Sequence, residues 1–204
     1  IGNLKFIESH KTKQNSNLKN FYKMFQNKKV WVASSTHNSE EEFCAKAHIE
    51  LKKKFNNLLT IIIPRHIHRV PKIIEEIKKL KLNYVLHSKK VKNLKNVDLY
   101  IVDTFGETNK FHMMASSVFL GGSIINRGGQ NPLEGARHGA KILHGPNTDN
   151  FKDIYKLLKV LNASKKINSS KELAQSIQFK KNRTIGIKIK NIGEKILKKT
   201  IKEL

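Results

Sequence analysis

The chain has 204 residues, enough for one large domain with a buried core, and its single cysteine, Cys44, excludes an internal disulfide and a cysteine-rich zinc site. Lys and Arg number 40 against 16 Asp and Glu, so the formal net charge is +24, which favours nucleic acid, a phosphorylated substrate or an anionic membrane surface as a partner. The lysines are spread almost evenly, however, and this is equally typical of a composition bias across a whole proteome.

Strands and helices alternate from the start of the chain. Residues 1–29 predict a leading segment and a short helix, and the apolar residues 30–33 predict a strand. A helix follows, because Ser39 and Glu42 have the spacing of a capping box and apolar side chains then recur every four residues on one face, at Phe43, Ala47, Leu51 and Phe55.

The same alternation continues to residue 161. Strands are predicted over 58–63, 84–86, 97–102, 118–120 and 141–143, and helices from Pro71, over 109–115, from Asn131 to about Gly139, and over 151–161. Strands that alternate with helices in this way are typical of a parallel sheet covered on both faces. We therefore predict an α/β fold with a Rossmann-like, doubly wound parallel sheet.

The last forty residues have a different pattern. Ser170 predicts the start of a helix over 171–178, and residues 185–204 predict a long basic helix interrupted at Gly186 and Gly193. We accordingly divide the chain into a Rossmann-like domain, residues 1–165, and a C-terminal helical extension, residues 166–204.

A glycine-rich stretch, FLGGSIINRGGQNPLE, occupies residues 119–134. Asn131 followed by Pro132 predicts a capped helix start, and glycines before such a start allow a phosphate to approach the free N–H groups. The alternative is a glycine-rich turn before an ordinary capped helix. In that case Glu134 only closes a cap with Asn131.

Polar residues follow five of the predicted strands, at 34–37, 65–66, 104–107, 121–123 and 145–147. Because ligands bind beyond the carboxyl ends of the strands in an open parallel sheet, these clusters predict one cleft for a nucleotide or sugar phosphate. Arg65 and the Gly122 and Ser123 amides suit a phosphate, while Glu107 and Glu134 suit sugar hydroxyls. Arg65 in a surface ion pair is the alternative.

Other chemistries lack support in the sequence. No Walker motif, dinucleotide fingerprint or nucleophile elbow is present. His66 and His68 have no third ligand at a useful spacing for a metal, and Cys44 fits helix packing better than a nucleophile.

Several of these motifs occur together in one known family. In order, they are GNLKF at 2–6, ASSTH at 33–37, EEE at 40–42, PRH at 64–66, DTFGE at 103–107, FLGGS at 119–123, RGGQNPLE at 127–134 and HGPNTDNF at 144–151. This succession closely resembles the C-terminal half of 3-deoxy-D-manno-octulosonic acid (Kdo) transferases over residues 2–160. Asn126, Gln130 and Gly135 depart from the family pattern of Pro, His and Pro, and Gln130 leaves any proton-carrying role of its position in doubt.

The resemblance implies the donor-binding C-terminal half of a GT-B glycosyltransferase that transfers Kdo from CMP-Kdo, without a metal or other cofactor. The catalytic general base is expected in an N-terminal acceptor domain, which this chain lacks, so we expect a fragment that binds the donor but does not transfer. Carried over motif by motif, the donor-binding residues are Ser34, Ser35, Arg65, His66, Thr104, Gly106, Glu107, Gly122, Ser123, Asn131 and Glu134.

The resemblance also implies partners and a location. The donor is CMP-Kdo, and the acceptor is the lipid A precursor (lipid IVA) of lipopolysaccharide biosynthesis, bound through the other domain. No apolar run approaches the ~20 residues of a membrane helix, so we expect a peripheral protein on the anionic cytoplasmic face of the inner membrane of a Gram-negative bacterium. A GT-B transferase for a UDP-sugar and a basic nucleic-acid-binding module are the alternatives, although the scattered lysines and few aromatic residues argue against nucleic acid as a partner.

Overall fold

The computed structural model describes residues 16–91 and 93–202. The expected leading segment up to residue 15, with the GNLKF motif at residues 2–6, therefore lies outside the described residues. The short helix expected before residue 29 is α1 (Ser16–Lys23).

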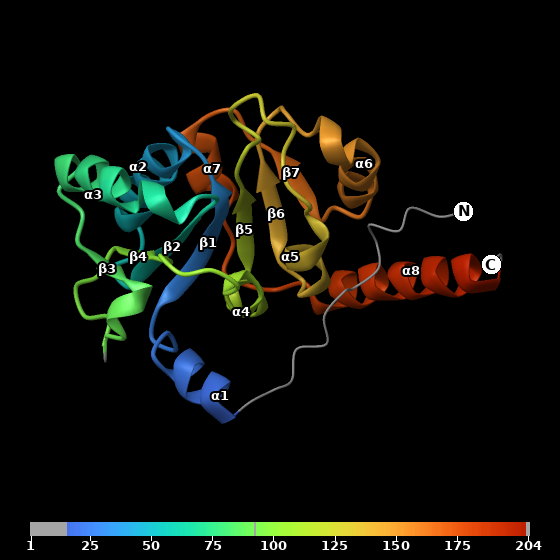
Figure 1. Cartoon of the computed structure of the whole chain (residues 1–204), viewed down its shortest axis with the longest axis horizontal. Coiled ribbons are helices and arrows are strands. Elements are labelled where there is room, and N and C mark those ends of the chain that lie inside the picture. The colour runs from blue at the N-terminus through green and yellow to red at the C-terminus, as the bar shows by residue number, and fades with distance from the viewer. Residues whose placement is uncertain (1–15, 92, 203–204) are drawn as a thin grey trace.

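Within the described residues, seven parallel strands form one sheet in the order β3-β4-β2-β1-β5-β6-β7 (Figure 1). The strands are β1 (Lys29–Thr36), β2 (Leu58–Pro64), β3 (Tyr84–Leu86), β4 (Leu99–Ile101), β5 (Ser117–Leu120), β6 (Lys141–His144) and β7 (Ser164–Lys166). The chain places β2, β3 and β4 on one side of β1 and then crosses to β5 on the other side. The strand order thus reverses between β1 and β5, and the predicted doubly wound α/β class is confirmed.

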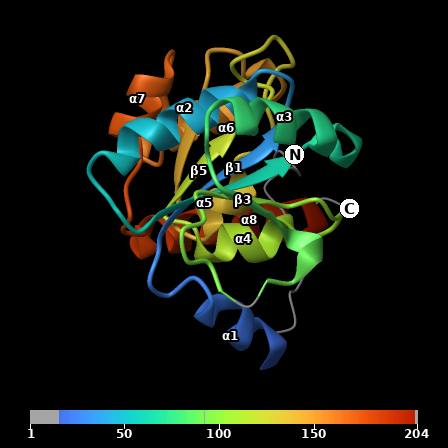
Figure 2. The same ribbon diagram turned by 90° about the vertical axis from the view of Figure 1, so that its left-hand side faces the viewer.

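Helices cover both faces of the sheet (Figure 2). One face packs against α2 (Glu40–Lys52), α3 (Val70–Lys79) and α7 (Ser170–Ser176), and the other against α4 (Thr108–Met114), α5 (Leu133–Arg137), α6 (Lys152–Val160) and α8 (Arg183–Lys202). Successive residues of β1 point to opposite faces, so Trp31 joins the first core while Val32 joins the second. All seven residues of β2 are buried, as its continuous apolar run predicts.

Two helix caps differ from those that the sequence predicts. Ser39 precedes α2 with φ +73° and its side chain makes no capping hydrogen bond, so the predicted capping box is wrong. The cap of α7 lies one residue earlier than predicted, because the side chain of Ser169 accepts the hydrogen bond from the N–H of Glu172 at 3.1 Å.

The C-terminal residues pack on the sheet domain. Ile167, Leu173 and Ala174 are buried in the same core as α2, and Ile189 of α8 is buried against the opposite face. The predicted interruptions at Gly186 and Gly193 are both wrong, since α8 continues through both positions. Within residues 16–91 and 93–202, no helix is long and apolar enough to cross a membrane.

Candidate functional site

Four of the five polar clusters predicted at the strand ends, at 34–37, 65–66, 121–123 and 145–147, meet at the carboxyl edge of the sheet, in the loops at the top of Figure 1, while the cluster at 104–107 lines a groove beside α1. The N–H of Arg65 donates to the carbonyl of Thr36, and the N–H of Gly121 donates to the carbonyl of Ser34, both at 2.9 Å. From β6, the N–H of Gly145 donates to the Ser123 hydroxyl oxygen at 2.8 Å. Residues far apart in sequence are thus joined at the edge where ligands bind in this fold class.

The carboxylate of Glu40, at the start of α2, lies at the centre of this edge. It accepts hydrogen bonds from four backbone N–H groups, at 3.0 Å from His37, 2.7 Å from Gly122, 3.2 Å from Ser123 and 3.0 Å from Ile124. Its side chain is fully buried. Burial raises the pKa of Glu40, while the four N–H donors oppose that shift. The Glu40 carboxylate therefore holds the glycine-rich loop against the end of β1.

This arrangement occupies the amides that the sequence assigned to the donor phosphate. The N–H groups of Gly122 and Ser123 both donate to Glu40, so a phosphate role for them stays a prediction. The loop also packs without spare room, because a Cβ on Gly121 would lie 2.3 Å from the carbonyl oxygen of Ser35. Ser35 itself has φ +55° and lies in an irregular step of the β1–β2 pairing.

Basic side chains surround this edge, and we call His37, Arg65, His66, His68 and Arg127 the basic rim. The ring centroids of His37 and His66 are 5.8 Å apart, and those of His66 and His68 are 5.6 Å apart. Arg127 joins them, since a Cβ on Gly122 would lie 3.3 Å from the Arg127 Cβ and 3.4 Å from the His37 Nε2. Four of the five rim residues are exposed and His37 is half-buried.

The nearby acidic groups do not neutralise the rim. Glu40 is bound by backbone N–H groups, and the buried Glu41 forms a two-point ion pair with Arg69, at 2.8 and 3.0 Å. Among the residues that the structure describes, neither the Arg65 nor the Arg127 guanidinium has an ion pair. Burial, and then the positive charges of His66 and Arg127, lower the pKa of His37.

Several buried polar atoms at this edge have no hydrogen-bond partner among the described residues. They are the hydroxyl oxygens of Ser34, Thr36 and Thr104 and the Nε2 of His37. Ser34 and Thr36 are almost completely buried. Buried polar groups in native proteins are nearly always paired, so these atoms mark a place where a ligand could supply the partners.

The remaining predicted residues lie on the segments that lead into α4 and α5. Asn131 lies one residue earlier than the N-cap position expected for it, since Pro132 is the N-cap of α5, but its Oδ1 still accepts the N–H of Leu133 at 3.0 Å. Glu134 instead faces α4, where its Oε2 lies 3.5 Å from Nδ1 of the buried His112. Burial raises the pKa of Glu134, but His112, together with the positive charges of His138 and Arg137, outweighs burial, so the pKa is lowered overall and the carboxylate is ionised at neutral pH.

Thr104 and Glu107 line a groove of about 660 Å³ between α1 and the segment that enters α4. Glu107 pairs with Lys110, whose Nζ lies 3.1 Å from His87 Nε2 and 4.6 Å from the ring centroid of Phe21. Gly106 has φ +79° with open space beside it. The groove thus combines an aromatic wall with charged groups at its rim.

The structure also shows site residues that were absent from the predicted set: Glu40, His37, Arg127 and His112. Glu40, His37 and Arg127 lie within the family motifs, which was the available signal. Within the described residues, no group of three or more His, Cys, Asp or Glu side chains is arranged to hold a metal ion.

Comparisons with known proteins agree with this architecture. The chain is 33% identical over 198 residues to a 3-deoxy-D-manno-octulosonic acid transferase from Rickettsia prowazekii, an alignment of 97% of this chain and 43% of the relative. It is 32% identical over 145 residues to the transferase of the same name from Haemophilus influenzae, covering 71% of this chain and 34% of the relative. The chain thus spans less than half the length of these relatives. No family model matches it.

A solved structure shares the fold. The C-terminal CMP-Kdo binding domain of WaaA from Acinetobacter baumannii superposes with a TM-score of 0.71 at 21% identity, covering 91% of this chain and 96% of that one. A bifunctional glycosyltransferase/methyltransferase from Fusobacterium nucleatum is also 35% identical over 161 residues, which is 76% of this chain and 24% of that protein. The resemblance inferred from the motifs and the predicted fold of a GT-B C-terminal domain are both confirmed.

Proposed function

Because the chain is related in sequence to Kdo transferases and shares the fold of a CMP-Kdo binding domain, we propose that it is the donor-binding part of a glycosyltransferase that uses CMP-Kdo. The acceptor in this proposal is the lipid A precursor of lipopolysaccharide biosynthesis. The acceptor and the general base belong to a part of the enzyme outside this chain.

The observation that carries the proposal is the set of unpartnered polar atoms at the carboxyl edge. Hydroxyls of Ser34, Thr36 and Thr104 and the Nε2 of His37 are buried there without partners among the described residues. Ser34, Thr36 and His37 lie at the end of β1, where the strand order reverses, which is the ligand-binding position of doubly wound sheets, and Thr104 follows β4 beside the groove. A ligand rich in hydroxyl and phosphate oxygens satisfies such groups.

The predicted donor-binding residues divide into two groups in this proposal. Arg65 and His66 of the basic rim suit the charged part of the donor, beside Ser34, Ser35, Gly122 and Ser123. Thr104, Gly106 and Glu107 line or border the groove, and Glu134, ionised and half-buried, is an acceptor for ribose or sugar hydroxyls. Asn131 has an indirect role, because its side chain accepts the N–H of Leu133 and so fixes the start of α5 and the position of Glu134.

The chemistry in this proposal is direct displacement of CMP at the anomeric carbon of Kdo. The leaving phosphate gains negative charge as the bond breaks, and preorganised cations beside it lower the barrier. No cofactor or metal takes part. Since the base belongs to the missing part, the isolated chain is expected to bind CMP but to release no product, and Kdo transfer by the chain alone would contradict this.

The charge of +24 fits a peripheral position at the anionic cytoplasmic face of the inner membrane, where the lipid acceptor is found. Sedimentation with vesicles tests this. We expect binding to vesicles that contain phosphatidylglycerol and little binding to pure phosphatidylcholine. Equal binding to both would contradict an electrostatic membrane contact.

The donor assignment is tested by thermal shifts with CMP, UMP, UDP and a short oligonucleotide at moderate salt. A ligand at a hundred times its Kd stabilises the fold by about 2.7 kcal/mol, so even weak binding is measurable. A shift with CMP and a smaller one with UMP is expected. A preference for UDP would favour another GT-B transferase, and a shift with the oligonucleotide alone would favour a nucleic-acid-binding module.

A further inference from the structure

The glycine-rich loop has the form of an anion-binding nest, but a protein carboxylate already fills it. Three consecutive N–H groups, of Gly122, Ser123 and Ile124, donate to Glu40 at 2.7–3.2 Å. A second anion at the same N–H groups would have to displace a fully buried carboxylate. A charged ligand at this edge therefore needs other donors.

The basic rim supplies them. We propose that the rim side chains of His37, His66 and Arg127, in place of the loop amides, form the subsite that binds the negatively charged group of the donor. The proposal rests on the proposed function, because it deepens the description of the same cleft. It assigns ligand contacts to His37 and Arg127, which the motif resemblance left without a role.

Three observations support an anion rather than a structural cluster. Within the part of the chain that the structure describes, the buried Nε2 of His37 has no hydrogen-bond partner, and a Cβ on Gly122 would lie 3.4 Å from it. The His37 ring lies 5.8 Å from the ring of His66. The two closest carboxylates, Glu40 and Glu41, are fully engaged by backbone N–H groups and by Arg69. Neighbouring basic groups that have no carboxylate partner among the described residues favour a phosphate or a carboxylate as ligand.

The anionic group has two possible sources in the proposed donor, the nucleotide phosphate and the sugar carboxylate. Both offer oxygen acceptors that suit a guanidinium fork and imidazole N–H donors. The experiment separates them with four probes: CMP, cytidine, free Kdo and inorganic phosphate. Cytidine keeps the base and ribose but carries no anion.

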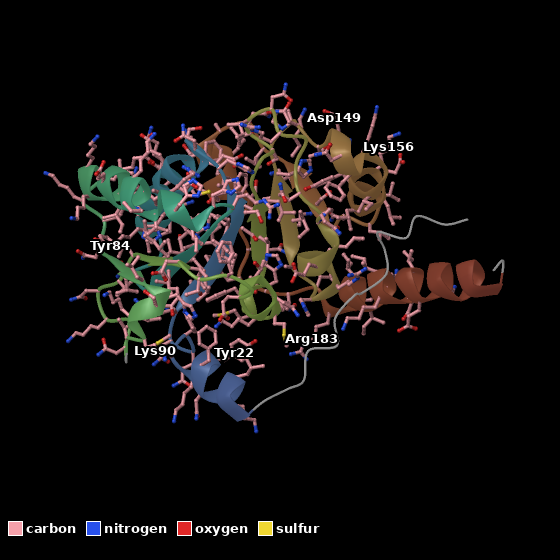
Figure 3. All side chains as sticks on the ribbon, viewed as in Figure 1. Tyr22, Tyr84, Lys90, Asp149, Lys156 and Arg183 are labelled. Carbon is pink, nitrogen blue, oxygen red and sulfur yellow. The ribbon has the colours of Figure 1, made fainter. Side chains whose placement is uncertain are left out.

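The test measures dissociation constants by calorimetry for the wild-type chain, Arg127→Gln and His66→Asn. Both residues are exposed, so the substitutions are expected to leave the melting temperature unchanged. Arg183→Gln is the matched control, because Arg183 is also an exposed arginine and lies at the opposite end of the sheet, at the start of α8 (Figure 3). His37→Asn is measured as a third variant, with its melting temperature as a check on folding.

We expect Arg127→Gln and His66→Asn each to weaken anion binding at least fivefold, with cytidine and the Arg183→Gln control unchanged. Weaker binding of CMP and inorganic phosphate identifies the nucleotide phosphate as the bound group. Weaker binding of free Kdo with CMP unchanged identifies the sugar carboxylate. Either result supports the subsite.

The remaining outcomes separate the subsite from the proposed function. If the rim variants bind CMP and Kdo as tightly as the wild-type chain does, the subsite is overturned while the donor assignment stands. If the wild-type chain binds phosphate through the rim but prefers UMP or UDP to CMP, the subsite stands and the donor assignment falls. Absence of binding by the wild-type chain to all four probes would overturn the subsite.

Discussion

Replacing Glu40 with Gln tests whether this carboxylate holds the glycine-rich loop. Four backbone N–H groups donate to its two oxygens at 2.7–3.2 Å, in a fully buried site. A glutamine side chain keeps one oxygen and places an NH₂ donor where the other oxygen was, so about two N–H groups lose their acceptor. Each buried donor left unpaired costs about 1–3 kcal/mol.

The expected loss is smaller than the plain sum, because a neutral amide avoids the cost of burying a charge. We therefore expect Glu40→Gln to lower the free energy of unfolding by about 2–4 kcal/mol. For a chain of this size each kcal/mol shifts the melting temperature by about 2–4 °C. Urea denaturation followed by circular dichroism measures the change.

Glu42→Gln is the matched control, since it makes the same substitution two residues later in the same helix. Among the residues that the structure describes, Glu42 pairs only with Lys46, and both side chains are about half-exposed. Such a pair contributes at most about 0.5 kcal/mol. If Glu40→Gln destabilised the chain no more than Glu42→Gln does, the inference that the Glu40 carboxylate stabilises the glycine-rich loop would be refuted.

Three further predictions concern the scaffold. Burial raises the pKa of Asp98, but hydrogen bonds from His48, Lys52 and the Asn83 N–H outweigh burial and hold that pKa well below its usual range. The ionised Asp98 therefore stabilises the fold above about pH 4, and this stabilisation is lost as the pH falls further. Asp98→Asn should abolish that loss in acid denaturation curves. Burial lowers the pKa of His138 to about 4, so as the pH falls below about 6.5 the unfolded chain binds a proton before the folded chain does, and the free energy of unfolding declines. His138→Asn should make the free energy of unfolding less dependent on pH between pH 6.5 and 4.5. An unchanged pH dependence would contradict this. A side chain at Gly186 would place its Cβ 2.8 Å from the Arg137 carbonyl oxygen. Gly186→Leu should therefore lower the free energy of unfolding by about 2 kcal/mol or more and make α8 accessible to proteolysis. The control is the neighbouring Ile187→Ala, at a residue 60% exposed, which should change the free energy of unfolding by less than about 0.5 kcal/mol.

The sequence predicted those parts of the fold that depend on local pattern. The apolar run at residues 58–63 predicted β2, and Asn131 before Pro132 predicted a capped helix start. β7 was not predicted, because its residues SKK carry no apolar pattern and its place is fixed by pairing with β6. Gly186 looked like a helix break but is instead the point where α8 contacts the chain after α5.

The site was harder to predict because its contacts join residues distant in the sequence. Glu40 meets Gly122, Ser123 and Ile124 across 82 to 84 residues, and nothing in the local EEE pattern distinguishes it from an ordinary acidic helix start. The predicted capping box was also wrong, because the backbone of Ser39 was not foreseen. The Glu40 carboxylate takes the His37 N–H, and Ser39 adopts a left-handed conformation that leaves its hydroxyl out of the cap. His112 likewise acquires its neighbour Glu134 only when α4 packs beside α5.

In the proposed function, this chain binds the nucleotide of CMP-Kdo at the carboxyl edge of β1, β2 and β5. The most direct test is to titrate the ¹⁵N-labelled chain with CMP and to map the amide chemical-shift changes onto the structure. We predict saturable changes in three segments, residues 34–37, 104–107 and 122–134, with larger effects for CMP than for UMP. Changes confined to α6 or α8, or no saturable change in these three segments, would contradict nucleotide binding at this edge.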